Sequence, residues 1–148
     1  MSNSFHYMSM AIHSMIHKKI FTNLKEEGLT IGQPKVLDYL RENEDASNKD
    51  IAGACYIEPA TLTSVLGRME KQGLAERITP DENRRILKIN LTPEGKQKAD
   101  QVNAEFMQIE DAAFQGISKE EREQFQGTYE KIYQNLKDYV KEGEKWRN

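Results

Sequence analysis

The chain has 148 residues, of which 37% are hydrophobic and 30% are charged, and its formal net charge is −3. This length fits one domain, or one domain with an appended helical element, and allows a real buried core. The composition is typical of a soluble, helix-rich globular protein. No apolar run is long enough to span a bilayer and the N-terminus lacks a secretory pattern, so we expect a cytoplasmic protein without a membrane partner.

Two helices are predicted at the start of the chain. Residues 1–27 carry apolar side chains at spacings of three and four, and Gly28 would end this helix. A second helix is predicted to begin at Thr30, whose hydroxyl would cap it while Gln33 completes a capping box. The buried stripe of the second helix would consist of Val36, Leu37 and Leu40.

A helix-turn-helix pattern follows. Ser47 and Asp50 have the spacing of a capping box, which predicts the start of a short helix. Proline is favoured at a first helical position, so Pro59 predicts a new helix after a tight connection at residues 56–58. Gly73 is placed to end that helix in the left-handed conformation. Two helices joined by so short a turn are typical of a helix-turn-helix.

A small β-hairpin and two further helices complete the chain. Residues 74–79 and 86–91 have period-two character, and turn-forming residues separate them, which predicts an antiparallel hairpin. Thr92 and Pro93 predict the start of a long helix that runs to about Gly116. The last helix is predicted to begin with a capping box formed by Ser118 and Glu121, and it carries an aromatic-rich stripe.

The helix that begins at Pro59 is the candidate nucleic-acid reader. Thr61, Ser64 and Arg68 share one stripe on its polar face. Short hydroxyl side chains let a helix approach base edges, and arginine reaches guanine or phosphate. A solvated polar face is the alternative, but the helix-turn-helix context favours DNA contact. The predicted major-groove residues are Pro59, Thr61, Thr63, Ser64, Arg68 and Lys71.

The hairpin tip is the second candidate contact with DNA. Arg84 and Arg85 are adjacent there, and a guanidinium beside a reading helix can enter the minor groove, where negative potential concentrates. Residues 58–92 contain 6 basic and 5 acidic residues, so their net charge is +1 although the whole chain is acidic. A solvated hairpin turn is the alternative interpretation of the two arginines.

The order of these elements and their residues resembles the multiple-antibiotic-resistance regulator (MarR) family of winged-helix transcription factors. The resemblance lies in residues 29–98, which include LTIGQPKVLDYL and then KDIAGACYIEPATLTSVLGRMEKQGLAERITPDENRRILKINLTPEG, and its most specific block runs from residue 70 to residue 95. It implies a mostly α fold with a small antiparallel β-hairpin wing, in which the helix from Pro59 to Lys71 enters the major groove. The family pairs an acid with an arginine in the wing, and these positions match Asn83 and Arg85. Asn83 thus replaces the usual acid, and Ser64 stands where many relatives have a basic residue.

The resemblance also implies how the chain is organised. A single MarR-like domain would cover residues 1–148, with the winged helix-turn-helix DNA-binding part at 30–92 and a helical dimerisation part at 1–27 and 93–148. A two-fold homodimer would present two reading helices about 34 Å apart and would bind a palindromic operator in double-stranded DNA.

Three side chains that are not among the predicted DNA contacts invite a functional interpretation. The family places an effector pocket between the dimer helices and the winged helix, where His13 and His17 are candidate lining residues, although they could equally be core or interface. Their spacing of four is also found between metal ligands, but no third ligand accompanies them, so we predict no metal and no cofactor. Cys55 is the only cysteine, which excludes an intramolecular disulfide, and a buried structural thiol is expected rather than a redox sensor.

The sequence predicts a dimeric DNA-binding transcriptional regulator, in this family more often a repressor, that a small molecule or chemical signal releases from DNA. A winged-helix protein-interaction module without DNA binding is the alternative, supported by the acidic net charge and the two departures from the family pattern. No catalytic arrangement of side chains and no phosphate-binding loop stands out, so an enzyme is not expected.

Overall fold

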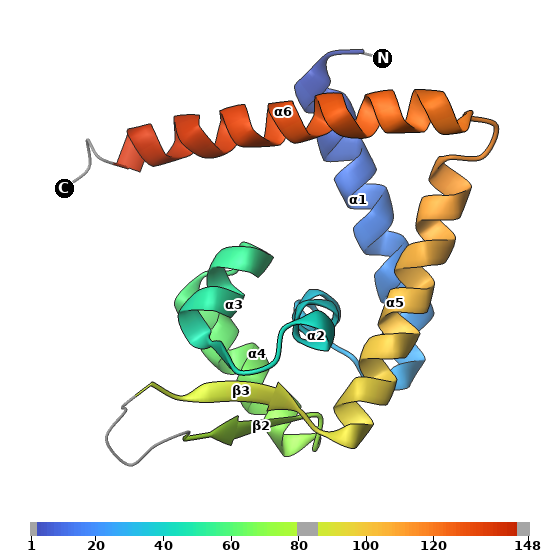
Figure 1. Ribbon diagram of the computed structural model, residues 1–148. Helices are drawn as coiled ribbons and strands as arrows, with labels where there is room; N and C mark the ends of the chain where they lie inside the picture. Colours follow the sequence, from blue (N-terminus) through green and yellow to red (C-terminus); the bar gives the residue numbers. More distant parts are fainter. Residues whose placement is uncertain (1–2, 80–85, 145–148) are drawn as a thin grey trace. The chain divides into compact units, whose positions relative to one another are not determined.

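A computed structural model describes residues 3–79 and 86–144 (Figure 1). The chain divides into two units, Met1–Ile109 and Glu110–Asn148. In chain order the elements are α1 (Phe5–Leu24), the 3-10 helix η1 (Lys25–Glu27), α2 (Gln33–Glu42), β1 (Ala46–Ser47), α3 (Asn48–Cys55), α4 (Pro59–Lys71), β2 (Ala75–Ile78), β3 (Lys88–Leu91), α5 (Pro93–Ala113) and α6 (Lys119–Glu144). The fold is therefore mostly helical with one small sheet, as predicted.

The junction between α1 and α2 differs in part from the prediction. Gly28 ends the first helical segment in the left-handed conformation, with φ of 75°, as expected. The predicted helix start at Thr30 is wrong, because α2 begins at Gln33 after a left-handed Gly32 with φ of 91°. Gln33 still performs half of a capping box, since its Oε1 accepts a hydrogen bond from the backbone N–H of Thr30 at 3.0 Å. The positive φ of Gly32 interrupts the helical backbone between these two residues.

The helix-turn-helix is formed by α3 and α4, with the predicted capping residues at its ends. Ser47 and Asp50 make a complete capping box at the start of α3. Tyr56 adopts the left-handed conformation with φ of 53°, which turns the chain between the two helices. At the other end of α4, Gly73 is left-handed as predicted, and the N–H of the next residue donates to the carbonyl oxygen of Met69 at 2.9 Å.

The sheet has one strand more than the sequence predicts. Strand β3 lies in the middle and pairs antiparallel with β2 and β1. In the predicted hairpin, Ala75 faces Leu91 and Ile78 faces Lys88. The short strand β1 comes from a polar segment without alternation, so its pairing depends on the proximity of β3 rather than on a local pattern. Strands β2 and β3 lie beneath α2, α3 and α4 in the view of Figure 1.

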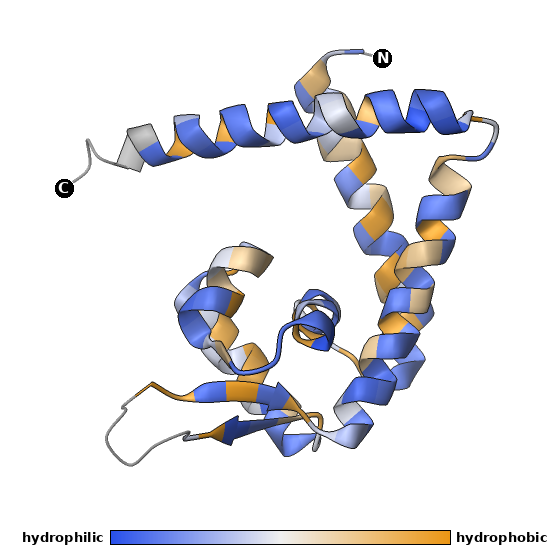
Figure 2. Cartoon of the chain, viewed as in Figure 1, coloured by the Kyte–Doolittle hydropathy of each residue, from blue (hydrophilic) through white to orange (hydrophobic). Residues whose placement is uncertain are grey.

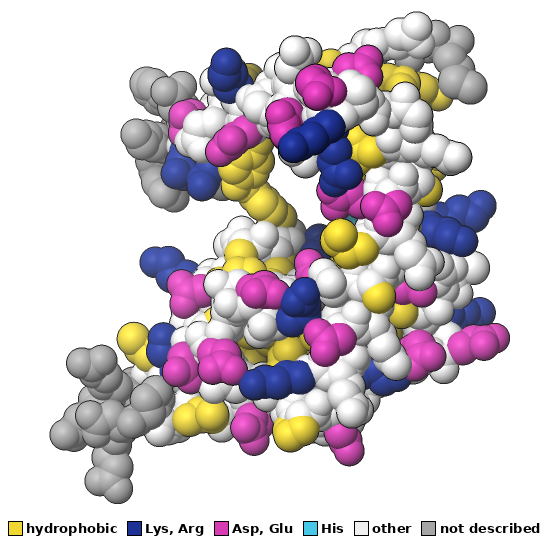
Figure 3. Space-filling view, turned by 45° about the vertical axis from the view of Figure 1, so that its right-hand side comes forward, with side chains coloured by type: hydrophobic (Ala, Val, Ile, Leu, Met, Phe, Trp, Pro, Cys, Tyr) yellow, Lys and Arg dark blue, Asp and Glu magenta, His cyan; other side chains and the backbone are white. Residues whose placement is uncertain are grey.

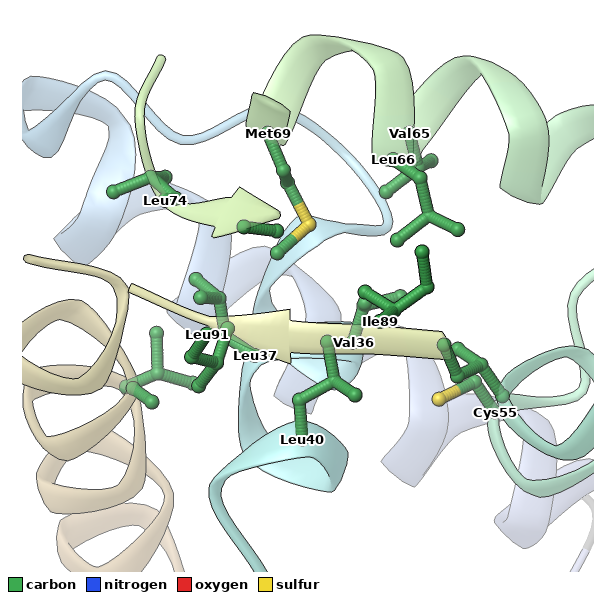
Figure 4. Close-up of a cluster of buried hydrophobic side chains, with 14 of the residues drawn as sticks. Val36, Leu37, Leu40, Cys55, Val65, Leu66, Met69, Leu74, Ile89 and Leu91 are labelled. Carbon is green, nitrogen blue, oxygen red and sulfur yellow. The ribbon is translucent and has the colours of Figure 1, made fainter. Parts of the chain in front are cut away.

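The core of the first unit joins α2, α4, the sheet and α5. Leu37, Leu66 and Met69 are fully buried, and Ile89 of β3 lies beside them (Figure 4). Val102 of α5 belongs to the same buried cluster. Removing one such side chain typically destabilises a domain by about 2–5 kcal/mol. The buried face of α4 is therefore held in place by its packing against the rest of the first unit.

The second unit contains the last turn of α5 and the whole of α6. The predicted capping box at the start of α6 is present: the N–H of Ser118 donates to Oε2 of Glu121 at 2.9 Å, and the N–H of Glu121 donates to Oγ of Ser118 at 3.2 Å. Apolar positions recur along α6 among polar ones (Figure 2). Within this unit Phe125 stacks on Tyr129, with ring centroids 5.1 Å apart.

Candidate nucleic-acid interface and adjacent pocket

Helix α4 has one buried face and one exposed face. Leu62, Leu66 and Met69 are fully buried, because apolar residues spaced by three and four lie on one side of a helix. All predicted major-groove residues are exposed, namely Pro59, Thr61, Thr63, Ser64, Arg68 and Lys71. The structure thus brings them together on the outside of a helix whose other side is anchored in the core.

The start of α3 is held by local polar contacts. The hydroxyl and the backbone N–H of Ser47 both donate to Oδ2 of Asp50, at 2.6 Å and 3.0 Å. These two hydrogen bonds hold the pKa of the Asp50 carboxyl below its usual value. The negative charge therefore persists at the N-terminus of α3, where the helix dipole also favours it.

The start of α4 follows from the chemistry of Pro59. Its missing N–H is no loss at the first helical position, where no intrahelical acceptor is available. The first intrahelical hydrogen bond runs from the N–H of Leu62 to the carbonyl oxygen of Glu58 at 2.9 Å. The helical backbone of α4 therefore begins directly after the turn that follows α3, and its first residue, Pro59, is already exposed.

The hydroxyl groups on α4 are not equivalent. Oγ1 of Thr63 donates to the carbonyl oxygen of Pro59 one turn earlier, at 3.0 Å. Its proton is therefore used within the helix, and Thr63 is left mainly as an acceptor toward an outside partner. Thr61, Ser64 and Arg68 share the stripe that faces away from the core, and they are the better candidates for donors.

An ion pair at the C-terminal end of α4 was missed by the sequence analysis. Nε of Arg77 in β2 lies 2.5 Å from Oε1 of Glu70 in α4, and both side chains are about one-third exposed or less. The pair connects the base of the hairpin to α4 and compensates the charge of an acid that is close in the chain to Arg68 and Lys71. Gly73 reverses the chain between the two partners, so neither helical nor strand periodicity predicts that Glu70 and Arg77 meet.

The predicted wing residues Asn83, Arg84 and Arg85 lie outside the described residues. Their roles remain predictions from the sequence. The strands that lead to them, β2 and β3, are described and pair in the register of a hairpin.

The charge of the described surface is mixed. On the face seen in Figure 3, basic and acidic side chains are interspersed. Arg68 and Lys71 are both in the last turn of α4. Any attraction for nucleic acid must therefore come from a local group of cations, since the net charge of the chain is −3.

A cavity of about 250 Å³ lies within the first unit, between α1, the segment that leads into α2, and α5. Most of its lining is apolar. His13 and His17 both line it, as the sequence analysis proposed, and Lys35 of α2 and Phe106 of α5 join them. Lys35 and Phe106 could not be found from the sequence, because only the packing of α2 and α5 against α1 brings them to the two histidines.

The nitrogen-bearing side chains give the cavity its polarity. The rings of His13 and His17 lie 4.3 Å apart between centroids. Burial lowers the pKa of His17, and the positive charges of a protonated His13 and of Lys35 lower it further. An anionic ligand would offset these repulsions, since an opposite charge favours the protonated imidazole.

Cys55 is buried, in agreement with the expected structural role. Its Sγ donates to the carbonyl oxygen of Lys35 at 3.5 Å, and Nζ of Lys35 donates to the carbonyl oxygen of Cys55 at 3.1 Å. Burial raises the pKa of the Cys55 thiol. The reactive thiolate is therefore disfavoured.

Two helical faces remain exposed although they are rich in large apolar side chains. On α1 these side chains include Phe5, Met8, Ile12 and Met15; on α6 they include Tyr129, Leu136, Tyr139 and Val140. Exposed apolar surface of this extent is typical of an interaction site. In the part of the chain that the structure describes, no three His, Cys, Asp or Glu residues group as metal ligands do, and no helix is long and apolar enough to cross a membrane.

Comparisons with known proteins agree with this architecture. Residues 29–87 match the sequence model of the MarR family. The HTH-type transcriptional regulator FarR of Neisseria gonorrhoeae is 31% identical over 98 residues, which cover 66% of each chain. The crystal structure of a complex of S. aureus MepR with DNA has the same fold, with a TM-score of 0.81, 23% identity and coverage of 91% of this chain and 99% of that chain. The structure of NadR in complex with 4-hydroxyphenylacetate is also similar, with a TM-score of 0.75, 22% identity and coverage of 88% and 93%. The family match, which spans α2, the helix-turn-helix and β2, together with the likeness to FarR, means that this chain belongs to the MarR family of HTH-type transcriptional regulators.

Proposed function

We propose that this protein is a homodimeric repressor that binds a palindromic DNA operator through α4 and leaves it when a small molecule occupies the cavity. The observation that supports this proposal most directly is the amphipathic character of α4. Its apolar side is buried, while the side that carries hydroxyl groups and basic residues is exposed. The crystallised complex of MepR with DNA, which has this fold, supports the proposal.

Ser64 and Arg68 are proposed to contact bases or phosphates in the major groove. Both are exposed on α4, one turn apart. Short hydroxyl groups allow close approach, and a guanidinium binds guanine or phosphate with two hydrogen bonds. Arg84 and Arg85 are proposed to contact the adjacent minor groove, as the sequence analysis predicts.

Fluorescence anisotropy on duplexes from the region upstream of the protein's own gene tests this function. Binding should weaken as salt increases, and Arg68→Ala should weaken it and flatten the salt dependence by about one unit of slope if Arg68 contacts phosphate. Lys119→Ala, which removes one exposed positive charge at the start of α6, is the matched control and should bind as the native protein does. If neither these duplexes nor random DNA at low salt binds, the protein-interaction alternative replaces the DNA-binding proposal.

The exposed apolar faces of α1 and α6 are proposed to form the dimer interface. A two-fold pair of chains would cover both faces, and it would place two α4 helices about one turn of DNA apart. Leu136→Glu puts a charge on the apolar stripe of α6 and should shift the protein toward monomer in sedimentation equilibrium. Asn135→Glu adds the same charge beside that stripe and should leave a dimer. A native protein that sediments as a monomer would contradict this part of the proposal.

The cavity is proposed to bind an organic acid with an apolar body. Its apolar lining suits a hydrocarbon or aromatic ring, while Lys35 and the two histidines suit a carboxylate. NadR binds 4-hydroxyphenylacetate, which has this chemistry. Calorimetric titration with 4-hydroxyphenylacetate, benzoate and octanoate provides the test.

At least one of these acids should bind, and Lys35→Met should weaken its binding by about tenfold or more, the effect of losing one charge-assisted hydrogen bond. Lys19→Met, on an exposed position of α1, should have no such effect. If all three acids fail to bind, the cavity is not a site for organic acids.

A further inference from the structure

Two glutamine side chains connect the rim of the cavity to the C-terminal end of α4. The rim segment is defined here as residues 28–33, and Leu29, Thr30, Ile31 and Gly32 of this segment line the cavity. Gln33 is 0% exposed and is the one fully buried polar side chain found among the described residues. Its partner Gln72 follows the last residue of α4.

The two amides form a continuous chain of hydrogen bonds. Oε1 of Gln33 accepts from the backbone N–H of Thr30 at 3.0 Å, and Nε2 of Gln33 donates to Oε1 of Gln72 at 2.8 Å. Nε2 of Gln72 then donates to the carbonyl oxygen of Gly28 at 2.9 Å. The side chain of Gln72 is thus bound to both ends of the rim segment.

The orientation of both amides is determined by the groups at the ends of this chain. The N–H of Thr30 can only donate, and the carbonyl of Gly28 can only accept. Turning either amide over would bring two donors or two acceptors together. A buried amide that loses its partner is costly, so the rim and Gln72 should move together rather than separately.

Gln72 is itself firmly joined to the reading face. Its backbone N–H donates to the carbonyl oxygen of Arg68, one turn earlier, at 2.9 Å. Arg68 is the residue proposed to contact DNA. A shift of Gln72 must therefore shift the last turn of α4 that carries Arg68.

A second contact joins the rim to the middle of α4. Gly32, which lines the cavity, approaches Val65 so closely that a Cβ on Gly32 would lie 3.1 Å from Cγ2 of Val65. The rim thus rests on α4 at Val65 and is hydrogen-bonded to it at Gln72. Two separated contacts constrain both the position and the direction of the helix.

We propose that Gln33 and Gln72 are positioning residues that couple the cavity to DNA binding. A ligand that displaces the rim moves the C-terminal end of α4, and DNA bound to α4 orders the rim in return, because coupling between two sites is reciprocal. This role rests on the proposed binding of DNA by α4.

Amide hydrogen exchange measures this coupling without knowledge of the effector. The probe is a duplex that the protein selects from a randomised library, and exchange is followed by mass spectrometry for peptides that cover 28–33 and 61–68. In the native protein, DNA should slow exchange in both segments, by about fivefold or more in the rim if the coupling has the usual strength. In Gln72→Ala, DNA should still slow exchange at 61–68 while the effect at 28–33 is lost.

Two further variants sharpen the test. Gln72→Glu keeps an acceptor for Gln33 but turns a carboxylate toward the carbonyl of Gly28, so it should also lose the effect on the rim. Gln101→Ala removes an exposed glutamine from α5 and should behave as the native protein does.

The outcomes separate this inference from the function on which it rests. Absence of any effect at 61–68 in the native protein would mean that α4 does not bind the duplex. An effect at 61–68 without one at 28–33, or an effect on the rim that persists in both Gln72 variants, would show that the two glutamines do not couple the sites.

Discussion

The imidazole rings of His13 and His17 lie 4.3 Å apart between centroids, one turn apart on α1. Lys35 lines the same cavity from α2. Burial, a protonated His13 and Lys35 all lower the pKa of His17. Two imidazoles and one ammonium group therefore share one largely apolar cavity, where the protonated form of His17 is disfavoured.

This arrangement predicts a pH dependence of stability. The pKa of His17 is lower in the folded protein than the ordinary value of 6.5, so the unfolded chain binds the proton more tightly. Stability from His17 is complete above the ordinary value and is lost as the pH falls from there through the folded pKa. We expect the Tm to fall less on acidification in His17→Gln than in the native protein, as measured by thermal unfolding between neutral and mildly acidic pH. His6→Gln, at an exposed position of α1, is the control, and identical pH profiles for the native and His17→Gln proteins would contradict the prediction.

Gly95 is predicted to be intolerant of any side chain. It is the third residue of α5, and a Cβ at this position would lie 1.8 Å from the carbonyl oxygen of Leu74. Gly95→Ala should therefore lower the free energy of unfolding by about 3 kcal/mol or more, through overpacking that the backbone cannot relieve. Gly127→Ala is the matched control, because a Cβ there meets nothing within 4 Å and the helix of α6 favours alanine by about 0.5–1 kcal/mol. Chemical denaturation measures the free energy of unfolding of both variants. A Gly95→Ala protein of native stability would disprove the predicted clash.

The pair between Glu70 and Arg77 is predicted to support DNA binding more than stability. Its side chains are partly exposed, so a double-mutant cycle with Glu70→Gln and Arg77→Met should give a coupling of only about 0.2–1 kcal/mol in unfolding. Arg77→Met leaves the Glu70 carboxylate uncompensated near Arg68, and this should weaken DNA binding. Adding Glu70→Gln should restore much of the lost affinity in the anisotropy assay. Equal DNA affinities for the Arg77→Met single variant and the double variant would contradict this account.

The capping box of α3 is predicted to matter for stability. The hydroxyl of Ser47 accepts from the N–H of Asp50 at 3.2 Å while the carboxylate of Asp50 accepts from Ser47. Ser47→Ala should destabilise the protein by about 1 kcal/mol, whereas Ser47→Thr keeps the hydroxyl and should change little. Urea unfolding measures both variants. A loss of the same size in Ser47→Thr would indicate that packing around β1, rather than the cap, is responsible.

The helices and their ends followed largely from the sequence, because their signals are local. Residues three apart in the chain, such as Ser47 and Asp50 or Ser118 and Glu121, meet in the first turn of a helix whatever surrounds it. Gly28 and Gly73 ended helical segments because only glycine adopts the left-handed conformation without strain. The buried and exposed sides of α4 likewise followed from helical periodicity, so the candidate reading residues were predicted as a group.

Only the tertiary structure brought together groups that are distant in the chain. Gln33 looked like a cap for a helix beginning at Thr30, but the folded chain buries it and pairs it with Gln72, 39 positions away. The meeting of Lys35 with His13 and His17, and the pairing of β1 with β3, also depend on how the helices pack. Sequence periodicity determines which face of a helix is apolar, but not which other face covers it. The sequence by itself therefore determined most helices, the two strands of the hairpin and the exposed face of α4, whereas the packing of α1, α2, α4 and α5 decided which residues line the cavity and that Gln33 meets Gln72.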